Sequence, residues 1–134
     1  MALSESLGLQ EQVTFTGRVD YSKMPAYYHC ADFFAMSSVT EVKPLVVLEA
    51  LAAGLPVLAV AACGTADTVS DGVDGWLCRE RLEEHADLFS RAFCSDLKPL
   101  SLAAVSKARD FSIVTYVDKL TQLYREEIAR LARA

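Results

Sequence analysis

The chain has 134 residues, a length typical of one domain, and 52% of them are hydrophobic, which is enough for a substantial core. Its formal net charge is −5. Up to Cys78 only three basic residues stand against nine acids, whereas from Arg79 onward ten basic residues stand beside nine acids. This balance argues against a basic patch that binds nucleic acid, so we expect no nucleic-acid partner.

Neither a membrane span nor a secretory leader is indicated. The longest apolar stretch, 45–62, is interrupted by Glu49, Gly54 and Pro56, and residues 1–10 carry no basic region. Four cysteines form no CxxC pair, which favours reduced, mostly buried thiols over a disulfide or metal framework. We therefore expect a cytoplasmic protein, with peripheral membrane association left open for a full-length parent.

The first predicted elements alternate between strand and helix. Val13–Thr16 is a β-branched and aromatic run that ends at Gly17, which predicts a strand. Met24–His29 is expected to form a short helix, with Pro25 tolerated in its first turn. The apolar run Asp32–Met36 predicts the next strand.

The stretch from 37 to 60 organises the chain. Small polar residues lead to Pro44, which suits the first position of a helix, and Gly54 is the expected stop of the helix 45–53. Val57–Val60 then predicts a buried strand. Glu41 and Glu49 are the acids of this stretch. Because ligands bind at the carboxyl ends of strands in an open α/β sheet, Glu41 and the helix start are expected at a ligand-facing edge.

The remaining chain predicts one more strand and a helical end. Turn residues at 70–75 lead into the strand Trp76–Cys78. Apolar residues at helical spacing then indicate helices over 82–93 and 100–109 and a last helix from Ser112. The alternation predicts an α/β fold with a parallel sheet of about four strands and helices on both faces.

The organising stretch resembles the Glu-x7-Glu signature of retaining nucleotide-sugar glycosyltransferases of the two-Rossmann (GT-B) architecture, in family 4. The residues at matching offsets are Ser38, Glu41, Glu49, Ala50, Gly54, Pro56, Val57 and Ala59. Residues 70–77 are also similar to a turn and strand of that family, written x-D-G-x-x-G-x-L. The resemblance covers about residues 13–78.

The resemblance implies that residues 1–134 form a single, partial nucleotide-sugar-binding domain. It would be the Rossmann-like second half of a C-terminal donor-binding domain, with the acceptor domain and the first βαβ half absent. The family transfers a sugar from a nucleotide-diphosphate donor with retention. The acceptor stays open between a lipid, a glycan and a small molecule, and the chain alone is expected to be inactive.

The resemblance also assigns roles to the two acids. Glu41 would be the catalytic residue that contacts the donor sugar, and Glu49 would accept hydrogen bonds from the ribose hydroxyls. The alternatives are that Glu41 is a solvated acid near a helix N-terminus and that Glu49 faces solvent on an amphipathic helix.

Further donor contacts are expected around these acids. Pro44 stands where the family has glycine and removes one N–H donor, which leaves the N–H groups of Leu45 and Val46 for the donor. Lys43 could add charge there or be a surface lysine. Gly64 and Thr65 could line the pocket or merely connect a strand to a helix. We expect no metal and no cofactor.

A competing interpretation is a non-catalytic α/β module that associates with itself. Removing half of a doubly wound domain would leave an exposed sheet edge, and such edges are normally covered or paired. A homo-oligomer formed through that edge is the expected consequence.

Overall fold

The computed structural model describes residues 2–133 and contains a three-stranded parallel sheet. Its strands are β1 (Phe34–Met36), β2 (Val57–Val60) and β3 (Gly75–Cys78), in the order β1-β2-β3. Phe34 lies opposite Val57, and Val57 lies opposite Gly75. Each strand is followed by helical structure, which returns the chain to the same end of the sheet and makes neighbouring strands parallel.

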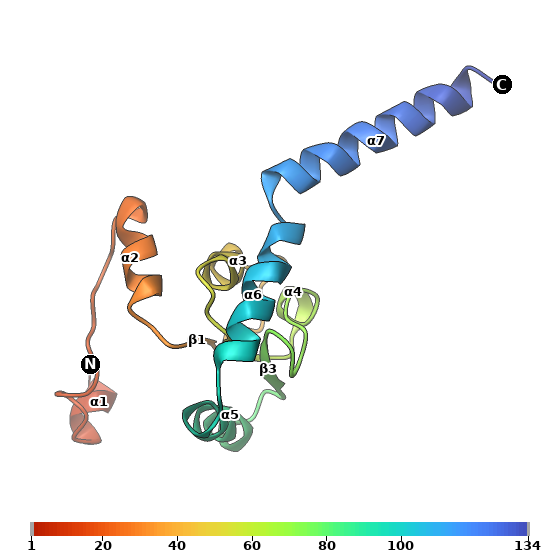
Figure 1. Cartoon of the computed structure of the whole chain (residues 1–134). Helices are drawn as coiled ribbons and strands as arrows, with labels where there is room; N and C mark the ends of the chain where they lie inside the picture. The colour runs from red at the N-terminus through yellow and green to blue at the C-terminus, as the bar shows by residue number, and fades with distance from the viewer. Residues whose placement is uncertain (1, 134) are drawn as a thin grey trace.

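Helices make up most of the remaining structure (Figure 1). The first half holds α1 (Ala2–Ser6), the 3₁₀ helix η1 (Tyr21–Lys23), α2 (Met24–His29) and α3 (Leu45–Ala52). The second half holds α4 (Cys63–Ala66), α5 (Leu82–Cys94), α6 (Lys98–Asp110) and α7 (Ile113–Leu131). No helix of residues 2–133 is both long enough and apolar enough to cross a membrane.

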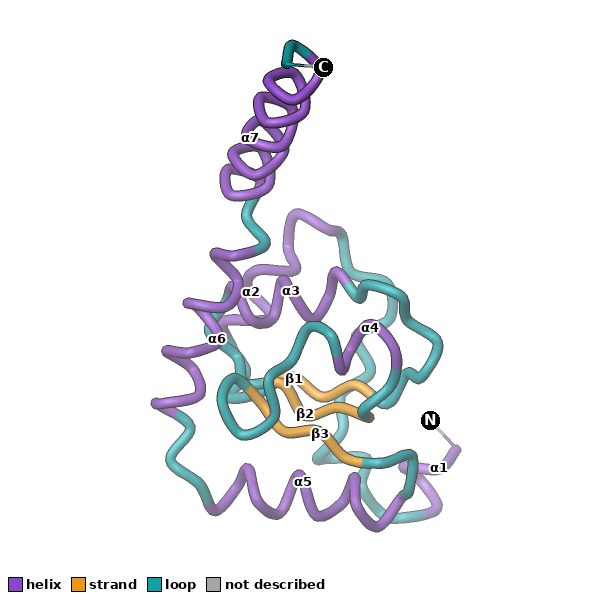
Figure 2. Tube along the Cα trace, turned by 90° about the vertical axis from the view of Figure 1, so that its right-hand side faces the viewer, coloured by secondary structure: helices purple, strands orange, loops and turns teal. Residues whose placement is uncertain are grey.

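Helices cover both faces of the sheet, as the sequence predicts. Figure 2 shows α5 on one side of the strands and α3 on the other. Leu58, on the face toward α5, packs in a cluster with Leu88 and Trp76. Val57, on the opposite face, packs in a cluster with Val47 and Leu51 of α3. Because β2 is central and fully buried, its side chains supply both clusters.

Helix α3 occupies the predicted place and presents one apolar face to the sheet. Val47, Ala50 and Leu51 are completely buried, at the spacing that puts them on one face of a helix. The helix ends before Gly54, whose φ of 82° lies in the left-handed region that favours glycine. After the turn at Gly54 the chain enters β2 within three residues, so the C-terminal end of α3 is held close to the start of the central strand.

The predicted strand Val13–Thr16 is wrong, and the described sheet therefore has three strands rather than about four. Val13 and Phe15 are 37% and 57% exposed, and these residues form neither helix nor strand. A strand requires a neighbour for its backbone hydrogen bonds, and within residues 2–133 β1 pairs only with β2. The edge of β1 is consequently unpaired in the described structure.

Of two further expectations, the structure confirms one and contradicts the other. The predicted helical end is confirmed by α5, α6 and α7, and Ser112 caps α7 by accepting a hydrogen bond from the Thr115 N–H at 3.1 Å. The expectation of mostly buried thiols is wrong, because Cys30, Cys63 and Cys94 are exposed and only Cys78 of the four is buried. These three thiols lie at element ends or beside turns, where short side chains stay accessible.

Candidate functional site

The candidate site lies at the carboxyl end of the sheet. The loop 37–44 follows β1 and carries Glu41, as predicted, and the short helix α4 follows β2. Since β1 and β2 are parallel neighbours, these two connections meet above the same edge. The contact between the loop 37–44 and α4 fixes the position of the Glu41 backbone.

Glu41 is exposed and lightly held through its side chain. The hydroxyl of Ser38 donates to Glu41 Oε1 at 3.2 Å, while the backbone carbonyl of Glu41 accepts the Gly64 N–H at 2.9 Å. The backbone is therefore fixed to α4, and the carboxylate remains open to solvent. This arrangement presents an accessible acid on a defined loop.

Gly64 permits that loop to sit directly on α4. A Cβ atom at Gly64 would overlap the carbonyl of Val42, so no other residue fits without moving one of the two segments. The N–H groups of Gly64 and Thr65 donate to the carbonyls of Glu41 and Ala62. Both residues are buried. Their N–H groups are thus engaged within the chain, and their position supports the loop that carries Glu41.

Glu49 projects from α3 toward the segment that precedes β1. Its two carboxylate oxygens accept hydrogen bonds from different phenols: Tyr21 donates to Oε1 and Tyr28 to Oε2, each at 2.9 Å. The three side chains border a hollow of about 280 Å³. The other residues that line it are Met24, Pro25, His29, Ala52 and Ala53. The lining is mainly apolar, with the hydrogen-bonded carboxylate as its polar end.

The environment of Tyr28 changes its ionisation. Removal of the phenol from water raises the pKa of Tyr28 to about 12, and the hydrogen bond to Glu49 and its negative charge add to the effect. The hydrogen bond to Glu49 also raises the pKa of the exposed Tyr21. Both hydroxyls therefore remain protonated donors at neutral pH.

The structure does not bring Glu41 and Glu49 into one hollow, although the roles that the resemblance assigns to them bring both acids to one donor. Glu49 lines the hollow beside α2, whereas Glu41 lies across the start of α3 with Ser38. Glu41 is four residues before α3 begins, whereas Glu49 is in the second turn of that helix. Glu41 lies on the loop that leads into α3, and Glu49 is the fifth of the eight residues of that helix.

The start of α3 holds the other predicted contacts. The first backbone bond of the helix runs from the Val47 N–H to the Pro44 carbonyl at 3.1 Å, so the N–H groups of Leu45 and Val46 precede it. Both residues are exposed. Lys43 lies with Nζ 4.3 Å from the ring centroid of Phe111, a cation–π contact with the end of α6. A positive charge and two N–H donors thus lie at this helix start.

Tyr21 and Tyr28 are the residues of this site that sequence reasoning missed. Tyr28 belongs to the stretch that resembles the glycosyltransferase family, yet its spacing from Glu49 gives no sign of a hydrogen bond across 21 residues. The clue lay in Glu49 itself, an acid among buried apolar neighbours that needs a donor. Within residues 2–133 no group of His, Cys, Asp and Glu side chains could hold a metal ion.

The chain matches a known protein family over most of its length. The family model for glycosyl transferases group 1 matches residues 1–101. The chain is 34% identical over 123 residues to a D-inositol 3-phosphate glycosyltransferase from Mycolicibacterium smegmatis, covering 91% of this chain and 28% of that protein. It is also 34% identical to the lipopolysaccharide glucosyltransferase WaaG from Escherichia coli, covering 83% of this chain and 29% of that protein. The chain therefore spans less than a third of these relatives.

Solved structures show the same fold. A sucrose-phosphate synthase from Thermosynechococcus elongatus aligns with a TM-score of 0.83 at 28% identity, over 96% of this chain and 33% of that one. HepE from Anabaena, solved in complex with UDP-glucose, aligns with a TM-score of 0.78 at 26% identity. The alignment covers 93% of this chain and 35% of HepE. These structural relatives are GT-B glycosyltransferases. Both the family match over residues 1–101 and this fold place the chain in the glycosyl transferases group 1 family.

Proposed function

We propose that this chain supplies part of the donor site of a glycosyltransferase that transfers a sugar from a nucleotide-diphosphate donor with retention. The observation that carries the proposal is the placement of Glu49 on α3, hydrogen-bonded on both oxygens at the polar end of a mainly apolar hollow. A nucleoside has an apolar base and a ribose diol that can donate to a carboxylate. The structures of Anabaena HepE in complex with UDP and with UDP-glucose support this class of ligand.

The other residues around α3 have roles that follow from this placement. The N–H groups of Leu45 and Val46, together with the helix dipole and Lys43, would stabilise the negative charge of the donor phosphates. Glu41 would lie at the donor sugar, where a carboxylate stabilises the positive charge that develops during transfer with retention. Gly64 and Thr65 would hold the Glu41 loop from beneath. Lys43 would have to leave the Phe111 ring to reach a phosphate.

Binding of UDP and UDP-glucose, measured by titration calorimetry, tests this proposal. Glu49→Gln keeps the shape but removes the charge, and a hydrogen bond to a charged group contributes about 1.5–3 kcal/mol. We expect UDP affinity to fall at least about tenfold, because 1.4 kcal/mol is one factor of ten. Glu84→Gln, which alters an acid on α5 paired with Arg79, is the matched control and should bind as the unaltered chain does. Equal affinity of all three proteins would contradict the proposal.

We expect residues 1–134 alone to show no transfer of sugar to an acceptor. The chain matches less than a third of its curated relatives, and the acceptor would be bound elsewhere in a longer protein. An assay of UDP release from UDP-glucose by the purified chain checks this expectation. Release well above the rate of the Glu41→Gln variant would overturn it.

The second candidate function is a non-catalytic module that associates with itself, and the unpaired edge of β1 favours it. Strand β1 is only partly buried and pairs with β2 on one side within the described chain. An unpaired parallel edge is a template for association. Sedimentation at micromolar concentrations distinguishes the candidates: a dimer that does not bind UDP supports the module, and a monomer that binds UDP supports the donor site.

A further inference from the structure

The two phenols that contact Glu49 differ sharply in how firmly the fold holds them. Tyr28 is 7% exposed and Tyr21 is 77% exposed, yet each donates to one carboxylate oxygen at 2.9 Å. The carboxylate is thus held from the interior by one hydroxyl and covered from the solvent side by the other. This asymmetry is the starting point of the inference.

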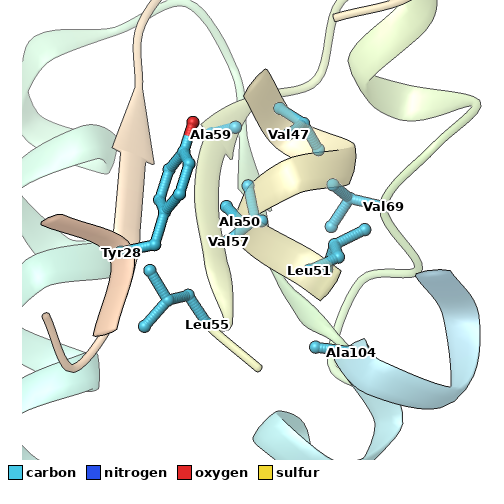
Figure 3. Packing of buried hydrophobic residues seen from close by; sticks show 9 residues of the cluster. All are labelled: Tyr28, Val47, Ala50, Leu51, Leu55, Val57, Ala59, Val69 and Ala104. Carbon is cyan, nitrogen blue, oxygen red and sulfur yellow. The ribbon is translucent and has the colours of Figure 1, made fainter. Parts of the chain in front are cut away.

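The direction of the Tyr28 hydroxyl is fixed by packing. Its ring meets Phe34 of β1 edge to face with centroids 6.2 Å apart, and it belongs to the buried cluster that includes Leu55 and Val57. Figure 3 shows Tyr28 and Leu55 at one end of this cluster and Ala104 at the other. A ring enclosed in this way keeps its hydroxyl aimed at Glu49 whether or not a ligand is present.

The Tyr21 hydroxyl is held in place by much less packing than the Tyr28 hydroxyl. Tyr21 begins the three-residue helix η1, which contains no buried residue and has no side-chain cap. A carboxylate oxygen can accept two hydrogen bonds, so Glu49 has acceptor positions beyond the two that the phenols use. The Tyr21 side chain borders the same hollow as Glu49, and this exposed side chain donates to Oε1. A ligand hydroxyl therefore displaces the Tyr21 hydroxyl more readily than the buried hydroxyl of Tyr28.

We propose that Tyr28 is a positioning residue that fixes the Glu49 carboxylate and that Tyr21 is a displaceable cap that holds the place of a ligand hydroxyl. For the identity of the ligand, a nucleotide with a ribose diol, the inference rests on the proposed function. On binding, one ribose hydroxyl replaces Tyr21 at Oε1, and Tyr28 stays at Oε2. The two tyrosines therefore have opposite effects on affinity, although they make the same hydrogen bond in the free protein.

Phenylalanine variants test this opposition with UDP as the probe. Tyr28→Phe keeps the ring in the cluster and removes the positioning bond, so UDP should bind about tenfold more weakly. Tyr21→Phe removes the competing donor, so affinity should stay equal or rise by about two- to threefold. Tyr27→Phe, a half-exposed neighbour on α2, is the matched control and should not change affinity. If Tyr21→Phe weakens binding as much as Tyr28→Phe, the cap is disproved.

A probe without one ribose hydroxyl separates positioning from a structural effect. With 2′-deoxy-UDP, the loss caused by Tyr28→Phe should shrink to less than about threefold, because Glu49 has lost part of its ligand partner. A merely structural role would weaken both nucleotides equally, and that result would overturn the assignment. Thermal unfolding of each variant checks that the fold is kept.

Titration of the ligand-free protein tests the arrangement independently of UDP. The ring-carbon NMR signals of Tyr21 and Tyr28 report the pKa of each phenol, and Glu49→Gln removes the negative charge that raises both values. We expect both pKa values to fall in Glu49→Gln, with that of Tyr28 still raised by its burial. Unchanged titrations would overturn the inference whatever UDP does. If the titrations shift but the unaltered chain does not bind UDP, the proposed function and the cap fail, and the positioning of Glu49 by Tyr28 stands.

Discussion

The middle of the chain and its two ends differ in what their apolar side chains contact. In the described residues, every buried hydrophobic side chain lies between Tyr28 and Ala104. Helices α1 and α7 bury none, and α7 extends away from the sheet in Figure 1. Yet α7 has 19 residues, against 13 in α5. The contrast shows that apolar periodicity predicts a helix but not whether the apolar face of that helix is covered.

The largest expected effect tests the buried middle. Leu51→Ala removes a fully buried side chain between α3 and the sheet, and such a change costs about 2–5 kcal/mol in the free energy of unfolding. Urea unfolding followed by circular dichroism measures the change. A loss below about 1 kcal/mol would mean that α3 is not part of the cooperative core.

A smaller effect is expected where the middle supports the site. Gly64→Ala places a methyl group against the carbonyl of Val42, and overpacking of this kind costs about 1–3 kcal/mol. Because the Glu41 loop must move, UDP-glucose should bind more weakly even at temperatures where the variant is folded. Ala66→Gly, at an exposed position of the same helix, is the control for a change of α4 alone. Unaltered stability of Gly64→Ala would contradict the close contact.

Substitution of Thr65 is expected to raise the free energy of unfolding rather than lower it. Its hydroxyl is buried and has no hydrogen-bond partner among the described residues. Thr65→Val replaces that hydroxyl with a methyl group of similar shape, so the variant should be more stable by about 1 kcal/mol. Thr68→Val is the matched control, because the Thr68 hydroxyl donates to the Gly64 carbonyl at 2.6 Å and its loss should destabilise. If both variants lose stability, Thr65 has a partner in solution.

The smallest effect is expected at the end of the chain. Ile128 is 66% exposed on α7, so Ile128→Ser should change the free energy of unfolding of the sheet by less than about 0.5 kcal/mol. Urea unfolding measures it under the same conditions as Leu51→Ala. A loss comparable to that of Leu51→Ala would show that the α7 face is covered in solution and would remove the difference between the middle and the ends.

The same contrast explains what could be predicted from the sequence. Val57–Val60 is apolar at every position because β2 is buried on both faces, so its pattern identified a central strand. Helix α3 was readable from its spacing and from Gly54. Val13–Thr16 has the composition of a strand, but composition cannot supply the neighbouring strand that its backbone needs. Burial of the thiols could not be predicted either, since it depends on packing between distant segments.

The candidate site likewise has one part that the sequence predicts and one part that depends on tertiary packing. The position of Glu41 on a loop at the carboxyl end of the sheet follows from the order of elements, which the sequence shows. The bonds from Tyr21 of η1 and Tyr28 of α2 to Glu49 depend on how these two elements pack against α3, and no spacing rule gives that packing. Local pattern thus located the acids, and tertiary geometry determined which groups hold them.

The order of the strands has a consequence for how the protein reaches its structure. Each strand pairs with the strand that follows it in the chain, so the sheet can grow by adding one strand and one helix at a time. The paired residues Phe34 and Val57 are 23 positions apart and Val57 and Gly75 are 18 apart, so each pairing closes only the loop that connects successive strands. During synthesis, β1 and β2 could pair before β3 and α5 have emerged. The three described strands would then be paired while α7 is still being made.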